Sequence, residues 1–153
     1  MNENFNYENR FKVIFASEEY SNLSKNVVDI TIPSIDIGTT IQPTMIRNLY
    51  IPGNSIEFGD ITITFLLDEE YTNYKKIFDW VKICRDFDEI NAEKMFSDIS
   101  VVLLNTKFNP ILTLKFENCF PFNLSDIPLN YQITTTEPVR FVTVFKINGY
   151  KIE

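Results

Sequence analysis

The spacing of apolar residues changes part-way through residues 56–85, and this change is the clearest structural signal in the chain. Ile61, Ile63 and Phe65 alternate with threonines, which is the two-residue period of a strand with two unlike faces. After Tyr71 the apolar residues recur every three or four positions, which is the period of an amphipathic helix. The pattern therefore predicts a strand that is followed by a helix over about residues 69–86.

Charged residues at both ends support this helix. Asp68 stands at the expected N-cap, acidic residues fill the first turn, and Lys82 and Arg85 lie in the last turn, where the helix dipole favours cations. Trp80 either packs beneath the helix or anchors an interface, and packing is the favoured interpretation. Cys84 continues the apolar stripe. The residues predicted to pack against the rest of the domain are Tyr74, Ile77, Phe78, Trp80 and Val81.

Further strands are predicted on both sides of the helix. Pro52, Gly53 and Asn54 form the strongest turn signal, which predicts a long hairpin over residues 44–67 with its tip at these three residues. The acidic stretch after the helix has no firm period, and residues 120–128 are interpreted as a loop or an irregular strand. The other predicted strands are residues 11–16, 26–37 (interrupted by Pro33), 99–104, 111–116 and 139–147.

These elements predict a single α+β domain over residues 1–153, mainly β, with largely antiparallel strands. No apolar run approaches the roughly 18 residues that a membrane span requires, and the polar start lacks the apolar core of a signal peptide. A soluble protein made in a cytoplasm is therefore expected. The strand at residues 139–147 is apolar on both faces, which fits either the core of a sandwich or a protein–protein interface.

Candidate catalytic chemistry is scarce. The chain has no histidine, which removes the commonest general base and the commonest transition-metal ligand. The acids at residues 68–70 fit helix capping better than paired-carboxylate catalysis, and those at 86–93 lack the spacing and glycine of a calcium loop. Cys84 and Cys119 are expected to be buried free thiols. The sequence thus predicts no catalytic, cofactor-binding or metal-binding residues and a protein that is not an enzyme. The net charge of −7 also argues against binding to a phosphate backbone.

A series of short motifs runs from the predicted hairpin tip to the end of the helix: a glycine, a T-x-T strand, an acidic pair and a D-W pair. These positions are Gly53, Phe58, Thr62, Thr64, Asp68, Glu69, Tyr74, Asp79 and Trp80. Downstream come the strand-like segments ISVVLL, LTLKFENCFPFNLSDIPLNY and VRFVTVFKI. The order and spacing of these motifs, over about residues 11–147, resembles the tail tube proteins of contractile-tailed bacteriophages, including the related baseplate subunit that initiates the tube.

The resemblance implies two packed antiparallel sheets, as a sandwich or barrel, flanked by one α-helix. Six copies would form a ring whose strands share one continuous β-barrel, and rings would stack head to tail into a tube. The implied function is that of a structural virion protein of the tail, assembled in the host cytoplasm. The tube would conduct tape-measure protein and DNA without sequence-specific binding. Its partners would be further copies of itself and the sheath, baseplate and tape-measure proteins, with no membrane and no cofactor.

The resemblance also implies which residues meet neighbouring copies or the lumen. The residues of the hairpin expected at the barrel between subunits are Ile46, Leu49, Tyr50, Gly53, Ile56, Phe58, Thr62 and Thr64. An acidic lumen would keep DNA from adhering by repulsion between like charges. The candidate lumen-facing acids are Asp29, Asp36, Glu57 and Asp60, offset by Arg47.

Several alternatives accompany this interpretation. A baseplate tube initiator, a tube-end protein and the inner tube of a contractile injection system would share the same fold. The short segment before Phe11 and the end at Glu153 favour the repeating subunit, because initiators of this family carry additional segments. A carbohydrate-binding β-sandwich is the alternative from a different class, but it would need clustered exposed aromatic residues, whereas the tyrosines here are scattered.

Overall fold

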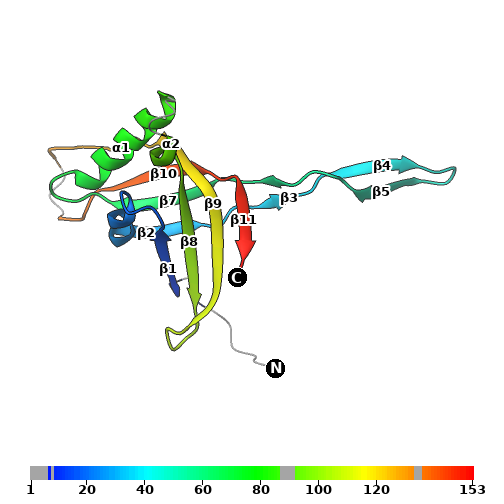
Figure 1. Ribbon diagram of the computed structural model, residues 1–153, viewed down its shortest axis with the longest axis horizontal. Helices are drawn as coiled ribbons and strands as arrows, with labels where there is room; N and C mark the ends of the chain where they lie inside the picture. The colour runs from blue at the N-terminus through cyan, green and yellow to red at the C-terminus, as the bar shows by residue number, and fades with distance from the viewer. Residues whose placement is uncertain (1–6, 8, 87–91, 133–135) are drawn as a thin grey trace.

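A computed structural model describes residues 7, 9–86, 92–132 and 136–153 of the chain (Figure 1). Strands dominate it, and α1 is its one long helix. The elements in chain order are β1 (Phe11–Phe15), the 3₁₀ helix η1 (Ser21–Asn26), β2 (Val27–Thr31), β3 (Ile35–Asp36), β4 (Thr39–Pro43), β5 (Asn48–Pro52), β6 (Glu57–Phe58), β7 (Ile61–Leu66), α1 (Thr72–Arg85), α2 (Ala92–Met95), β8 (Ser97–Leu104), β9 (Pro110–Leu124), β10 (Arg140–Lys146) and β11 (Gly149–Ile152).

Seven antiparallel strands form a sheet that bends into two facing halves. Neighbouring strands follow the order β1-β8-β9-β10-β7-β2, and β11 pairs with β9. β9 belongs to both halves, because its first part pairs with β8 and β11 and its last part pairs with β10. The Phe15 ring in β1 lies 6.4 Å from Phe65 in β7 and 6.1 Å from Phe145 in β10, so the halves enclose one core. The antiparallel, mainly-β prediction is confirmed. Within the described residues, β1 and β2 do not pair, so the domain by itself is not a closed barrel.

β9 changes partners at a β-bulge. Its register against β8 shifts by one residue opposite residues 97–99, so β9 carries one extra residue there. Asn118, within the bulge, has a φ of 50°, in the left-handed region that Asn tolerates better than most residues. The Asn118 N–H donates to Asp98 Oδ1 at 2.9 Å, and the Asn118 carbonyl accepts from Asn148 Nδ2 at 2.8 Å. Two neighbouring strand ends therefore satisfy the backbone groups that the bulge removes from the ladder.

The core lies between the two halves and is strongly aromatic. In β7 and β10 the buried residues alternate with half-buried ones, as the two-residue period requires. The apolar strand β10 is thus a core strand on its Phe141–Phe145 face, and the sandwich interpretation is confirmed for that face. The buried apolar residues are Val13, Phe15, Tyr20, Leu23, Ile61, Ile63, Phe65, Ile77, Trp80, Ile99, Val101, Leu114, Phe116, Cys119, Phe141, Phe145 and Ile147.

α1 covers one end of the sandwich (Figure 1). The Trp80 ring is completely buried and lies 5.5 Å from Phe145. Tyr20 stacks on Trp80 at 3.8 Å with an interplanar angle of 8°. The Trp80 indole donates to the Met95 carbonyl at 2.7 Å, and the Tyr20 hydroxyl donates to the Lys94 carbonyl at 2.6 Å. These contacts fix α1 against α2 and the segment before η1, so packing, the favoured role of Trp80, is the one the structure shows.

The prediction that Phe78 packs against the domain is wrong, because 47% of this residue is exposed. The buried face of α1 centres on Ile77 and Trp80, and each residue advances about 100° around the helix. Phe78 therefore lies beyond the edge of that face, whereas Tyr74 and Val81 lie at its border and are half-buried against the core. The spacing alone placed Phe78 in the stripe because it stands four residues after Tyr74.

The helix begins at Thr72 instead of residue 69. The chain turns just before it, since Tyr71 has a φ of 60°. Asp68 still accepts a hydrogen bond from the Thr72 N–H at 2.6 Å, so its carboxylate caps the helix from four residues upstream. Asn73, which is 4% exposed, accepts from the Asp68 N–H at 3.4 Å and donates to the Leu66 carbonyl at 2.5 Å. The end of β7 and the start of α1 are thereby joined by side chains.

A two-stranded arm leaves the sandwich between β2 and β7 and extends far from it (Figure 1). The β3–β6 pair forms its base and the β4–β5 pair its outer part. The chain reverses at residues 44–47, where the Thr44 N–H donates to the Arg47 carbonyl at 3.0 Å. The predicted tip at residues 52–54 is wrong: these residues lie part-way along the returning strand. The hairpin is therefore longer than residues 44–67 and begins before β3.

Two further parts of the chain differ from the sequence prediction. Residues 120–124 continue β9, so only the residues after Leu124 form a loop. β11 and α2 were not predicted at all, and residues 87–91 of the acidic connection lie outside the described part. Cys119 is buried and Cys84 half-buried, and both are free thiols. No helix in the described residues is long and apolar enough to cross a membrane.

Candidate assembly interface

The arm gathers nine large exposed apolar residues on one two-stranded extension. Every residue of β4 and β5 is exposed. At the tip, Met45 and Ile46 are 105% and 94% exposed. An isolated two-stranded hairpin is at best marginally stable in water, and large exposed apolar patches mark interaction surfaces. The exposed large apolar residues of the arm and its base are Ile35, Ile37, Ile41, Met45, Ile46, Leu49, Tyr50, Ile51 and Ile56.

Two glycines form a joint between the base of the arm and its outer part. Gly38 has a φ of 70°, a backbone conformation that residues with a side chain rarely adopt. Gly53 stands across from it, and its N–H donates to the Gly38 carbonyl at 3.0 Å. A Cβ at Gly53 would lie 2.4 Å from the Ile37 carbonyl oxygen. The turn signal at residues 52–54 thus marks a close approach of the two arm strands.

The structure divides the predicted barrel residues into two groups. Five of them lie along the arm: Ile46, Leu49, Tyr50, Gly53 and Ile56. Phe58 sits at the base, where its ring stacks on Tyr150 of β11 at 6.2 Å. Thr62 and Thr64 lie in the body of the sheet, half-buried on the face of β7 that points away from the core, opposite Val144 and Val142 of β10. The outer sheet face and the arm are therefore separate surfaces of one subunit.

The four predicted lumen acids do not form one cluster. Asp36 and Glu57 stand directly opposite each other in the β3–β6 pair, and both are exposed. Like charges in this position destabilise a strand pair unless water or a partner compensates them. Asp29 lies in β2 opposite Thr64, on the outer sheet face. Asp60 forms an ion pair with Lys146 at 3.2 Å, so its charge is already compensated.

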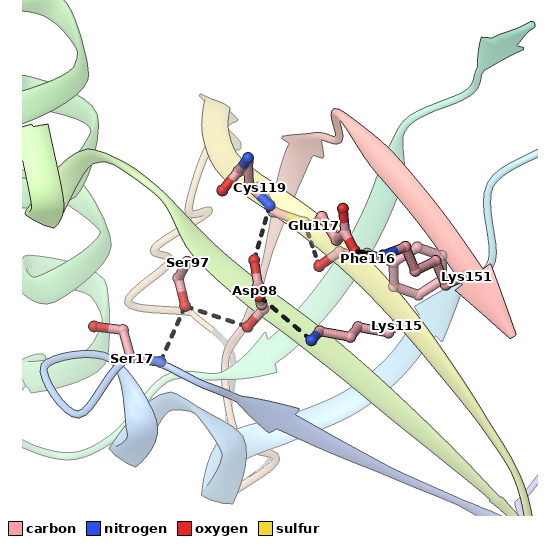
Figure 2. Close-up of polar contacts among 9 residues, drawn as sticks. Ser17, Ser97, Asp98, Lys115, Phe116, Glu117, Cys119 and Lys151 are labelled. Atoms are coloured by element: carbon pink, nitrogen blue, oxygen red, sulfur yellow. Dashed lines mark hydrogen bonds and ion pairs between the residues drawn. The ribbon is translucent and has the colours of Figure 1, made fainter. Parts of the chain in front are cut away.

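A group of charged side chains surrounds the bulge of β9 (Figure 2). Asp98 Oδ2 lies 3.9 Å from Lys115 Nζ, while its other oxygen holds the bulge backbone. Glu117 and Lys151 form a second ion pair at 2.9 Å. The hydrogen bond from Lys151 lowers the pKa of Glu117 below its usual range. Opposite charges are paired across neighbouring strands, which indicates a structural role for the group.

The two cysteine thiols are not activated by their surroundings. Burial raises the pKa of the Cys119 thiol to about 12 and that of Cys84 to about 11, so both are protonated at neutral pH and poor nucleophiles. The Cys119 thiol donates to the Phe116 carbonyl at 3.5 Å. No group of three or more His, Cys, Asp or Glu residues in this part of the chain is arranged to hold a metal ion.

Comparison with solved structures finds proteins with the same architecture. The sheath–tube complex of PVC, an extracellular contractile injection system, contains a chain that superposes with a TM-score of 0.72 at 17% identity, over 99% of this chain and 93% of the other. The tube-terminating cap of the anti-feeding prophage gives a TM-score of 0.74 at 15% identity, over 100% and 93%. The chain has the contractile-tube fold. Hcp1 from Flavobacterium johnsoniae shares it more distantly, with a TM-score of 0.52 at 14% identity over 93% of each chain.

The contractile-tube fold is thus shared although only 15–17% of the aligned residues are identical. No protein-family model matches the sequence, and no curated protein does. The covered shares show that the arm and the sandwich together account for almost the whole length of the PVC and anti-feeding prophage chains. The likeness of this sequence to tube proteins, inferred from short motifs, is therefore confirmed at the level of the fold.

Sequence reasoning missed the outer strands of the arm and its true tip. The segment T-T-I-Q-P, which forms β4, carries β-branched residues and could have been paired with N-L-Y-I-P, which forms β5. The signal at the tip is Thr44, whose hydroxyl bonds to the Arg47 carbonyl and accepts from the Arg47 N–H at 3.0 Å. Such a turn needs neither glycine nor proline within it. The hairpin tip was therefore predicted at the stronger turn signal of Pro52–Asn54.

Proposed function

We propose that the chain is the repeating subunit of a contractile tube, built from hexameric rings that stack head to tail. The exposed arm carries this proposal. A monomer gains little from an extension whose outer strands β4 and β5 are exposed at every residue. A subunit that lays the extension on its neighbours buries that apolar area and pairs its free edges. The contractile-tube fold supports the same conclusion.

The outer face of β7, β10 and β2 is the surface best suited to line a shared barrel. Its residues are mixed: threonines and valines in the centre, with Asp29 and Lys146 near its margins. A wall of this kind is polar enough to face water in a lumen. Asp36 and Glu57, which lie at the base of the arm and form no ion pair in the described residues, would supply the negative charge. Like charge would let DNA or an acidic cargo slide without adhering.

In this proposal the tube belongs to a phage tail or to a contractile injection system of the same design. Sheath and baseplate proteins would be its partners outside and below, and a tape-measure protein would occupy the lumen during assembly. In a virion the tube would conduct DNA during ejection. The second candidate function is that of a tube-end or tube-initiator protein. It is supported by the cap, terminator and baseplate structures that share the fold.

Negative-stain electron microscopy of the purified protein tests the proposal. We expect rings or tubes of uniform bore with six-fold class averages. Ile46→Asp should abolish them while leaving the thermal unfolding of the monomer unchanged, because this residue is 94% exposed in the free subunit. Ile111→Asp is the matched control, since Ile111 is 58% exposed but lies outside the arm. A wild-type protein that stays monomeric at high concentration, without assembly on incubation, contradicts the proposal.

The copy number in the native particle separates the two roles within the fold. A repeating subunit should be present in many stacked rings, whereas an initiator or terminator should be present in a single ring. Quantitative mass spectrometry of purified particles, scaled to the sheath protein, measures this number directly.

A further inference from the structure

The two ends of the sandwich differ in how they are closed. α1 and Trp80 fill one end, where the rings of Phe15 and Phe145 meet the indole. At the other end no helix of the described residues lies between the halves, and β1 and β2 approach without pairing (Figure 1). A cleft of about 220 Å³ opens there, smaller than the roughly 300–1,000 Å³ of small-molecule sites.

The cleft is lined by side chains that point toward the core. Phe11 of β1 pairs with Leu103 of β8. Two residues along each strand, the pair Val13 and Val101 is buried in the core, so Phe11 and Leu103 face the same side of the sheet. From the opposite half, Ile30 pairs with the buried Ile63 and so faces inward too. The apolar side chains that line the cleft are Phe11, Ile30, Ile32, Val101 and Leu103. Ile32 is still 41% exposed, so apolar surface at this end is left open to solvent.

The tip of the arm has the complementary chemistry. Met45 and Ile46 are apolar and almost completely exposed in their own subunit. Arg47 follows them, and Asp29 lies on the rim of the cleft. Arg10 also lines the cleft, and its guanidinium lies over the Phe108 ring at 4.0 Å. No ion pair engages Arg47 or Asp29 in the described part of the chain, so the tip would bring a cation to an unpaired carboxylate.

We infer that the tip of one copy inserts Met45 and Ile46 into the open end of the sandwich of a second copy and pairs Arg47 with Asp29 there. The tip cannot reach the cleft of its own subunit, because the arm extends away from β1 and β2 (Figure 1). Beyond the glycine joint, five residues per strand project the tip by roughly 17 Å at about 3.3 Å per residue. Donor and acceptor are different surfaces of each copy, so the contact is heterologous and propagates as a ring or a filament. The inference rests on the proposed tube function and adds to it the acceptor site.

A disulfide between copies tests the inserted tip. The double variant Ile46→Cys, Ile32→Cys should form a ladder of oligomers on a non-reducing gel after oxidation of assembled protein. The matched control Ile46→Cys, Ile152→Cys places the second thiol on β11, outside the cleft and 63% exposed. We expect at least about tenfold more product from the first pair, because a disulfide requires Cα atoms within about 7 Å. Tubes that form while both pairs cross-link equally, or only the control does, overturn the inference and leave the tube function standing.

A charge exchange tests the ion pair without relying on cysteine. Arg47→Asp and Asp29→Arg should each raise the protein concentration at which tubes form by at least about fivefold, and the combined variant should restore it to within about twofold. Effects that simply add in the combined variant overturn the pairing. All four proteins should have the same unfolding temperature as monomers, since both side chains are exposed.

The reactivity of a cysteine placed in the cleft tests whether a second copy covers it. In the Ile46→Asp background, which keeps the subunit monomeric, an Ile32→Cys thiol should react with a maleimide; in assembled tubes of Ile32→Cys alone it should be protected. Protection already in the monomer means that the cleft is covered within its own copy, and this result overturns the inference. If the wild-type protein forms no tubes at all, the proposed function fails first.

Discussion

β9 changes partners at its bulge, and replacing Asn118 by Val tests whether the left-handed backbone of the bulge is a source of strain. Asn118 has a φ of 50°, and only its backbone N–H and carbonyl take part in the hydrogen bonds that hold the bulge. The substitution therefore changes the conformational energy of one residue and removes no hydrogen bond that the structure shows. A left-handed backbone costs a residue with a Cβ about 1–2 kcal/mol, and a β-branched side chain is among the least tolerant.

We expect Asn118→Val to lower the free energy of unfolding by about 1–2 kcal/mol, which is roughly 2–8 °C in unfolding temperature for a domain of this size. Asn118→Gly should stay within about 0.5 kcal/mol of wild type, because glycine adopts this φ freely but also gains entropy in the unfolded chain. Urea unfolding followed by tryptophan fluorescence, in the monomeric Ile46→Asp background, measures both. Equal losses for Val and Gly would refute the reasoning, since strain could not then be the cause.

Other predictions follow from burial, close contacts and charge. Ile77→Ala should lower the free energy of unfolding by about 2–5 kcal/mol, whereas Phe78→Ala, at an exposed position, should lower it by less than about 1 kcal/mol. Urea unfolding measures both values, and equal losses would contradict the assigned helix face. Gly53→Ala should leave the sandwich unfolding unchanged but reduce tube formation under the microscope, because the new Cβ would meet a carbonyl oxygen across the arm at 2.4 Å; normal tubes would show that the joint is not required. The lowered pKa of Glu117 stabilises the folded state above the ordinary carboxyl pKa of 4.5 and loses this effect as the pH falls through the lowered value. Lys151→Gln should therefore flatten the acid limb of the stability curve measured by thermal unfolding, and an unchanged acid limb would remove the ion pair as its cause.

The elements with a strong period could be predicted from the sequence. β7 and α1 were located to within three residues because Ile61, Ile63 and Phe65 alternate cleanly and because the buried face of α1 repeats at helical spacing. Periodicity did not resolve the exact edge of that face, and Phe78 was misplaced for this reason. The order of motifs was enough to indicate the contractile-tube fold.

The arm and the bulge could not be predicted from alternation in the same way, because neither shows a two-residue period of buried and exposed positions. β4 and β5 are exposed on both faces, so no alternation marks them. Asn118 occupies its left-handed conformation because Asp98 and Asn148, twenty and thirty residues away in sequence, satisfy its backbone groups. Among the candidate site residues, the sequence could suggest that Ile46 and Tyr50 face a partner, but not that Thr62 and Thr64 belong to a different surface.

The exposed arm also has a consequence for the subunit before it assembles. Both edges of the β4–β5 ribbon are free, and such edges can pair with any other strand that approaches them in the crowded interior of a cell. The net charge of −7 opposes such encounters, because subunits of like charge repel each other over about one Debye length, roughly 8 Å at physiological ionic strength. In the proposed tube the first contact between two free subunits would therefore be slow, and an existing ring that offers several acceptor surfaces at once would offset the repulsion. Growth from an existing end should thus outpace spontaneous nucleation, and the lag before tubes form should shorten as salt is added.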